Sequence, residues 1–166
     1  MGTIPQHIVD EAWQELNHFT DAQIHREMNR LAACQPHLLG FFIEFTQDLD
    51  VEVNGLAMFM FVAVYRMFEK CAPMQIEQIT DETIETCFEE NEHLIESLKG
   101  VHERFFQRIA EVQLEAQPNV MRYIVEGLFE APEDEEDPVE LTEEDTGYLF
   151  LLLKTVTDLL HKAMAE

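Results

Sequence analysis

Apolar residues recur at intervals of three and four along almost the whole chain, and this spacing predicts helices. No segment keeps up a two-residue alternation, so we expect no β-strand. Residues 56–65, LAMFMFVAVY, are apolar on every face. A helix that is apolar all round must be surrounded by other helices. The pattern therefore predicts an all-α fold with this segment at the centre of the packing.

Capping residues and prolines place the ends of the expected helices. Thr20 and Gln23 have the spacing of a capping box, and Thr142 can cap the last helix. Pro36 and Pro118 suit the first turn of a helix, where an N–H group has no intrahelical partner. A similar start at Thr80 opens a long helix. The expected helices span residues 5–18, 20–35, 36–49, 50–71, 80–112, 118–129 and 142–165.

Two parts of the chain resemble each other in the order of these features. QPHLLGFFIE at residue 35 corresponds to QPNVMRYIVE at residue 117, and residues 55–70 correspond to residues 147–162. WQELNH at residue 13 likewise corresponds to FEENEH at residue 88. We interpret this as an internal repeat, approximately 5–72 and 80–165, of a three-helix unit. The alternative is that helical periodicity alone makes the two parts look alike.

The repeat and the helix count together define the expected architecture. We expect one domain over residues 1–166, a helical bundle of about six or seven helices built from two duplicated three-helix units. Its apolar third helices would meet near a pseudo-twofold axis. Between residues 130 and 145, ten of sixteen residues are acidic and two are proline, which is typical of a solvated loop.

Composition and charge narrow the classes of function. The 34 acidic residues outnumber the 10 basic ones, for a formal net charge of −24. Phosphate binding depends on clustered Lys and Arg, so we expect no nucleic-acid ligand. The longest apolar run is about half the length that crosses a bilayer, and the N-terminus does not resemble a secretory leader. We therefore expect a cytoplasmic protein without a membrane span.

One group of residues resembles a metal site in its spacing. Glu15 and His18 form a Glu-x-x-His unit, as do Glu90 and His93. Two such units, with Glu44 and Glu126 from other helices, have the ligand inventory of carboxylate-bridged di-iron bundles. Helix phase places all of these side chains well away from the apolar stripes, towards solvent. We therefore predict no metal ligands, with Glu15, His18, Glu90 and His93 as the alternative.

Two charged residues interrupt the apolar helices at corresponding positions. Arg66 and Asp158 are 92 residues apart, the spacing of the repeat in this region. If the two helices cross antiparallel, these side chains could form a buried pair. Alternatively, both lie where the helices emerge into solvent. In either case we expect packing to hold the centre, so that Arg66→Met leaves the fold intact.

No recognisable catalytic motif occurs in the sequence. Glycine-rich phosphate loops, Cys-His-Asp arrangements and calcium-loop spacings are missing, and the three cysteines suggest small buried hydrophobes. We expect no catalytic residues and no cofactor. The leading hypothesis is a non-catalytic interaction module that binds a basic protein partner, and a homodimer is a further option. The alternatives are a metal-binding protein or enzyme that uses the Glu-x-x-His pairs, nucleic-acid mimicry, and a charge that serves solubility alone.

Overall fold

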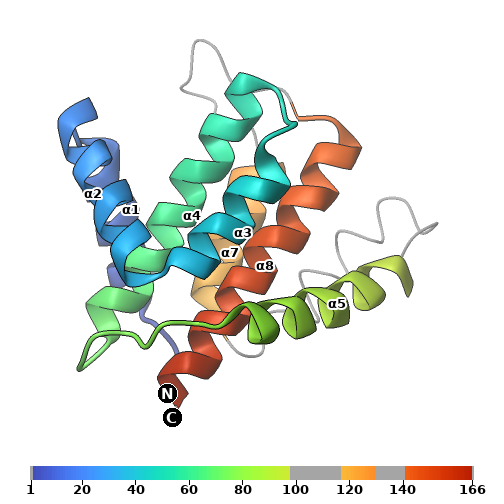
Figure 1. The fold of residues 1–166 in the computed structure, drawn as a ribbon. Helices are drawn as coiled ribbons and strands as arrows, with labels where there is room; N and C mark the ends of the chain where they lie inside the picture. Colours follow the sequence, from blue (N-terminus) through green and yellow to red (C-terminus); the bar gives the residue numbers. More distant parts are fainter. Residues whose placement is uncertain (1, 98–116, 130–140, 166) are drawn as a thin grey trace.

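The computed structural model describes residues 2–97, 117–129 and 141–165, and it confirms the all-α fold (Figure 1). Within these ranges there are seven helices and no β-strand. The helices are α1 (Gln6–Asn17), α2 (Asp21–Cys34), α3 (Pro36–Thr46), α4 (Val51–Cys71), α5 (Asp81–Ser97), α7 (Pro118–Phe129) and α8 (Glu143–Ala165).

The helix starts coincide with the expected capping residues. The Thr20 hydroxyl accepts a hydrogen bond from the Gln23 N–H, and the Gln23 side chain accepts one from the Thr20 N–H. Thr142 accepts a bond from the N–H of Asp145 in the same way. Each local arrangement satisfies an N–H group that the first turn of a helix leaves without a partner. The expected continuation of the α5 helix to residue 112 lies outside the described residues.

Two boundaries differ from the expectation. The third helix ends at Thr46 rather than near residue 49, and the Asn54 side chain donates a hydrogen bond to the Thr46 carbonyl. This bond satisfies a carbonyl group at the end of the helix. The acidic loop expected over residues 130–145 is described only from residue 141, and Glu143 already belongs to α8.

The core is built around α4 and α8, which lie side by side (Figure 1). In α4 the continuous run Phe61–Tyr65 is buried, and in α8 the run Leu149–Thr157 is buried. Helix α1 packs on α4, and α5 packs on α8. Burial of these apolar faces is the main favourable contribution to folding. The largest fully buried side chains are those of Phe42, Phe61, Phe68, Phe150, Ile4, Leu38, Met60, Met67, Ile84, Ile124 and Leu149.

Among the described helices, only α4 is long and apolar enough to span a membrane by length and composition. However, 56% of its most apolar stretch is buried inside the protein. The core helix of a soluble protein has the same length and burial, and α4 has that position here.

Two buried glutamines join distant parts of the chain. Gln35 donates a hydrogen bond to the Glu77 carbonyl and accepts one from the Ile79 N–H. Gln117 donates to the Gly2 carbonyl and accepts from the Ile4 N–H. Each side-chain amide thus bonds to the segment that precedes a helix, α5 in the first case and α1 in the second. The first of these contacts brings the N-terminal ends of α3 and α5 together.

Candidate functional site

The residues of the two Glu-x-x-His units lie on α1 and α5. His18, Glu90 and His93 are exposed, as helix phase predicted, and Glu15 is half-buried. Among the described side chains, no group of three or more His, Cys, Asp or Glu residues is placed to hold a metal ion. Glu15 instead accepts hydrogen bonds from Arg66 and Lys70.

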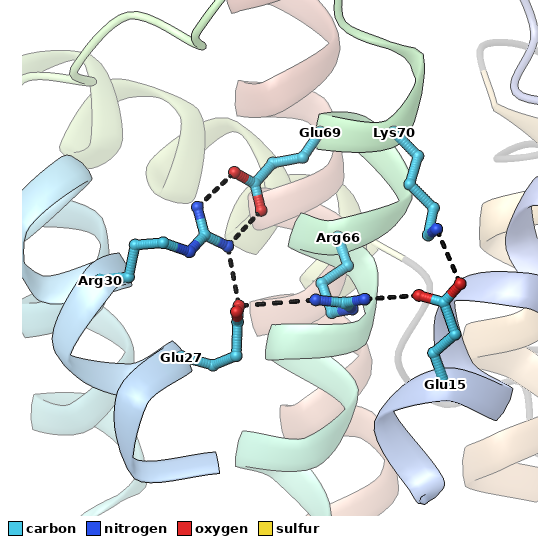
Figure 2. A network of polar contacts seen from close by, with 6 residues as sticks. All are labelled: Glu15, Glu27, Arg30, Arg66, Glu69 and Lys70. Atoms are coloured by element: carbon cyan, nitrogen blue, oxygen red, sulfur yellow. Dashed lines mark hydrogen bonds and ion pairs between the residues drawn. The ribbon is translucent and has the colours of Figure 1, made fainter. Parts of the chain in front are cut away.

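Arg66 does not pair with Asp158, so the buried pair, one of the two alternatives considered for these residues, does not form. Figure 2 shows its guanidinium between two carboxylates, 2.6 Å from Glu15 on α1 and 3.6 Å from Glu27 on α2. The guanidinium also lies over the Phe19 ring, 4.9 Å from its centroid. Arg66 faces α1 and α2, whereas α8 packs on another part of α4. Asp158 has other partners, described below.

The contacts of Arg66 belong to a larger charge network across α1, α2 and α4. Arg30 donates hydrogen bonds to both oxygens of Glu69 and to Glu27, and Lys70 donates one to Glu15 (Figure 2). The bond from Lys70 and the bond from Arg66 lower the pKa of Glu15, against an opposing effect of burial. Each carboxylate in this network faces at least one cation, so the network joins helices and leaves little charge for a ligand.

Asp158 belongs to a second polar cluster, between α5 and α8. Lys154 is only 5% exposed, and its ammonium donates hydrogen bonds to Asp158 and to the Asn91 side chain. The Asn91 amide in turn donates to Thr155 and Asp158. The buried position of Lys154 was not predicted from the sequence. A signal was present, because Lys154 ends an apolar run and lies four residues before Asp158, the spacing of an i,i+4 ion pair. A buried cation with these partners serves packing of α5 on α8.

The three cysteines are free thiols in the structure. Cys87 is buried as expected, and burial raises the pKa of its thiol to about 11. Such a thiol stays protonated at neutral pH and is a poor nucleophile. Cys34 and Cys71 are half-buried, and burial also raises the pKa of Cys71.

A groove between α3 and α5 is the candidate functional site. It has a volume of about 440 Å³ and begins where Gln35 holds the segment that leads into α5. Helix α3 contributes one wall and the first two turns of α5 contribute the other. The lining residues are Pro36, His37, Gly40, Phe41, Glu44, Phe45, Asp81, Ile84, Glu85 and Phe88.

Three half-buried phenylalanines form the aromatic floor of this groove. Phe41 and Phe45 are one turn apart on α3, with ring centroids 4.9 Å apart. Phe88 from α5 packs against both, at 5.5 Å from Phe41 and 5.0 Å from Phe45. The Phe41 and Phe88 rings are nearly perpendicular, with an interplanar angle of 71°. The floor therefore presents ring surfaces in more than one direction.

Carboxylates surround the aromatic floor. Asp81 lies 3.2 Å from the His37 ring, so α3 and α5 are joined at their N-terminal ends. Glu44 and Glu85 are exposed, one on each helix. Within the part of the chain that the structure describes, neither carboxylate has a Lys, Arg or His partner within 4.0 Å. The groove thus combines an aromatic floor with two carboxylates that have no ion pair with any Lys, Arg or His of residues 2–97, 117–129 and 141–165.

The corresponding positions near α1 and α7 are occupied differently. By the sequence correspondences of the expected repeat, Trp13 aligns with Phe88 and Gly127 aligns with Phe45. The side chain of Met60 lies against Gly127, where a Cβ atom would come within 2.7 Å of it. Asp10, which corresponds to Glu85, accepts hydrogen bonds from Gln6 and Trp13. Asp10 and Trp13 thus contact each other, whereas Glu126 on α7, which aligns with Glu44, is exposed.

Comparisons of the chain with protein-family models, curated proteins and solved structures found no match. The groove between α3 and α5 therefore has to be interpreted from its own residues and geometry.

Proposed function

We propose that the protein is a non-catalytic interaction module that binds a basic segment of a partner protein in the groove between α3 and α5. The observation that carries this proposal is the pair of exposed carboxylates, Glu44 and Glu85, on either side of an aromatic floor. Aromatic rings supply apolar contact area, and unpaired carboxylates supply attraction for a cation. A basic segment that places one side chain in the groove would contact both the aromatic rings and the carboxylates.

The distribution of cations supports a basic partner. The chain has only 10 Lys and Arg residues. Three of these, Arg30, Arg66 and Lys70, are bound to carboxylates in the network of Figure 2, and Lys154 is buried. The remaining acidic groups contribute to a negative field over the surface, which accelerates association with a positively charged partner. Charge complementarity therefore favours a basic segment over an acidic or neutral one.

We also propose that the fold arose by internal duplication. The buried positions of α1 are Val9, Ala12 and Leu16, and each has a buried counterpart 75 residues later, in Ile84, Cys87 and Asn91. Gln35 and Gln117 are 82 residues apart, and each side chain bonds to the backbone of a segment that leads into a helix, α5 for Gln35 and α1 for Gln117. Under this proposal only one of the two related faces became a binding groove. The cytoplasm is the compartment in which we expect it to act.

The test measures peptide binding to the full chain and to two matched variants. The probe is a fluorescein-labelled, 12-residue synthetic peptide that alternates Arg with Ser and Leu. Glu44→Lys reverses a charge in the groove, and Glu126→Lys reverses the charge at the corresponding exposed position of α7. Both variants have the same net charge. We expect Glu44→Lys to weaken binding about tenfold, equivalent to 1.4 kcal/mol, and Glu126→Lys less than twofold.

Salt provides a second measurement in the same assay. Because charges attract the peptide, fluorescence anisotropy should show weaker binding as the NaCl concentration rises from 50 to 300 mM. If the two variants weaken binding equally, the peptide responds only to net charge and the proposed groove is wrong. Failure of the unmodified protein to bind any basic peptide at 50 mM NaCl contradicts the function itself.

A further inference from the structure

Arg66 shows how this protein binds a guanidinium group within its own fold. The Arg66 guanidinium lies over the Phe19 ring. Carboxylates from two different helices, Glu15 on α1 and Glu27 on α2, contact its nitrogen atoms (Figure 2). The guanidinium thus has both an aromatic ring and carboxylates as partners. This combination suits arginine, whose guanidinium can stack and donate several hydrogen bonds at once.

The groove between α3 and α5 has the same two kinds of partner. Its floor consists of Phe41, Phe45 and Phe88, and its carboxylates, Glu44 and Glu85, come from two different helices. No arginine of the described chain contacts these carboxylates. We propose that the groove selects arginine over lysine in its partner, a specificity that rests on the binding function proposed above.

The choice between the two basic side chains follows from their chemistry. A lysine ammonium is a compact and strongly hydrated charge, so contact with phenylalanine rings removes water that the rings do not replace. A guanidinium is more weakly hydrated and keeps its N–H groups in the plane, where carboxylates can accept from them while a ring covers its face. A trimethylated ammonium would also stack, but it has no N–H group to donate to Glu44 or Glu85. Arginine alone uses both parts of the groove.

The experiment compares peptides that differ at a single residue. The parent probe carries one Arg in a sequence of Ser, Gly and Leu, and the others carry Lys, citrulline or norleucine at that position. Fluorescence anisotropy with the full chain should show at least tenfold tighter binding of the Arg probe than of the Lys probe. The neutral citrulline and norleucine probes should bind more weakly still, because they lack the charge that Glu44 and Glu85 attract.

Two groove variants separate stacking from charge. Phe88→Leu keeps an apolar side chain but removes the ring, so the preference for Arg over Lys should fall from about tenfold towards twofold. Glu44→Gln should weaken the Arg and Lys probes together. Because Phe88 also contacts two other rings, circular dichroism must show that the variant is folded, and Phe45→Leu repeats the test from α3.

The outcomes distinguish this proposal from the one on which it rests. Equal binding of Arg and Lys probes, both weakened by Glu44→Gln, would show that arginine selection is wrong while the basic-segment function stands. A preference for Arg that survives both Phe88→Leu and Phe45→Leu in folded protein would also overturn the stacking geometry. If no basic probe binds the unmodified protein, both proposals fail.

Discussion

Two regions of the molecule collect carboxylates around aromatic rings, and they differ in whether cations accompany them. In the network of α1, α2 and α4, Glu15 and Glu27 contact Arg66, which lies over Phe19. In the groove of α3 and α5, Glu44 and Glu85 flank three phenylalanines, and the described residues supply no cation to either. The first arrangement joins helices, and the second is the groove in which we propose that a partner binds.

This difference shows that the position of the few cations carries more information than the net charge. A charge of −24 describes the whole chain and could serve solubility alone. The ion pairs show where acidic residues are already neutralised. Carboxylates outside those pairs, next to an apolar surface, identify a candidate interface. The comparison makes separate predictions for the two regions.

The largest effect should come from removing the cation at the centre of the network. Arg66→Ala removes the hydrogen bond to Glu15, the ion pair with Glu27 and the contact with Phe19, at a side chain that is only 15% exposed. We expect the free energy of unfolding to fall by about 2 to 3 kcal/mol in urea titrations. Arg66→Met keeps most of the packing and should cost about half as much, with the fold intact.

A matched control for Arg66 is Arg26, an exposed residue on α2. Arg26→Ala should change the free energy of unfolding by less than about 0.5 kcal/mol. If Arg66→Met fails to fold, charge rather than packing stabilises this part of the molecule. The prediction that Arg66→Met costs less than Arg66→Ala is then wrong. If Arg66→Ala is as mild as Arg26→Ala, the network does not join the helices.

The fold could be predicted from the sequence because its signals are local. Two helix starts are marked by side-chain hydrogen bonds within one turn, at Thr20 and Thr142. Two others are marked by prolines in the first turn, Pro36 and Pro118, which have no N–H group to leave unpaired. The end of α3 could not be predicted in this way. Its last carbonyl is satisfied by Asn54, from the next helix, and such a contact depends on how the two helices meet.

The candidate site could be predicted only in part. The exposure of Glu44, Glu90 and His93 follows from helix phase. The pair between Arg66 and Asp158, one of two alternatives, does not form, because matching positions in two similar segments need not face each other. The groove was missed because Phe88 is distant in sequence from α3. The sequence does show Phe41 and Phe45 one turn apart on α3. Their contact with Phe88 on α5 depends on tertiary packing.

A smaller effect should separate Glu15 from its counterpart Glu90. Folding lowers the pKa of Glu15 below its ordinary value of 4.5, so its ionised form stabilises the folded state. This contribution is fully present above about pH 4.5 and disappears as the pH falls through the lowered pKa. Because the side chain is 39% exposed, solvent screens the pair. Glu15→Gln should therefore cost only about 0.5 to 1 kcal/mol at pH 7.

The measurement compares urea denaturation of the unmodified protein, Glu15→Gln and Glu90→Gln at pH 7 and pH 3. The cost of Glu15→Gln should be smaller at pH 3 than at pH 7, because a lower pH favours the protonated carboxyl group. Glu90 is exposed and has no ion pair among the described residues, so its variant should show no such change. Equal pH dependence in both variants would contradict a special role for the Lys70 and Arg66 contacts.

The smallest effect should have the opposite sign and lies in the groove. Glu44→Gln removes a carboxylate that has no cation partner in the described chain but feels the repulsion of many other acids. We expect a gain of about 0.2 to 0.5 kcal/mol at 20 mM NaCl, measured by thermal denaturation, and a smaller gain at 300 mM because salt screens that repulsion. With the Arg probe bound, the same substitution should lower the melting temperature of the complex, because the carboxylate then has a partner. If Glu44→Gln instead destabilises the free protein as much as Glu15→Gln does, Glu44 is already paired within the folded chain, and the contrast between the two regions is lost.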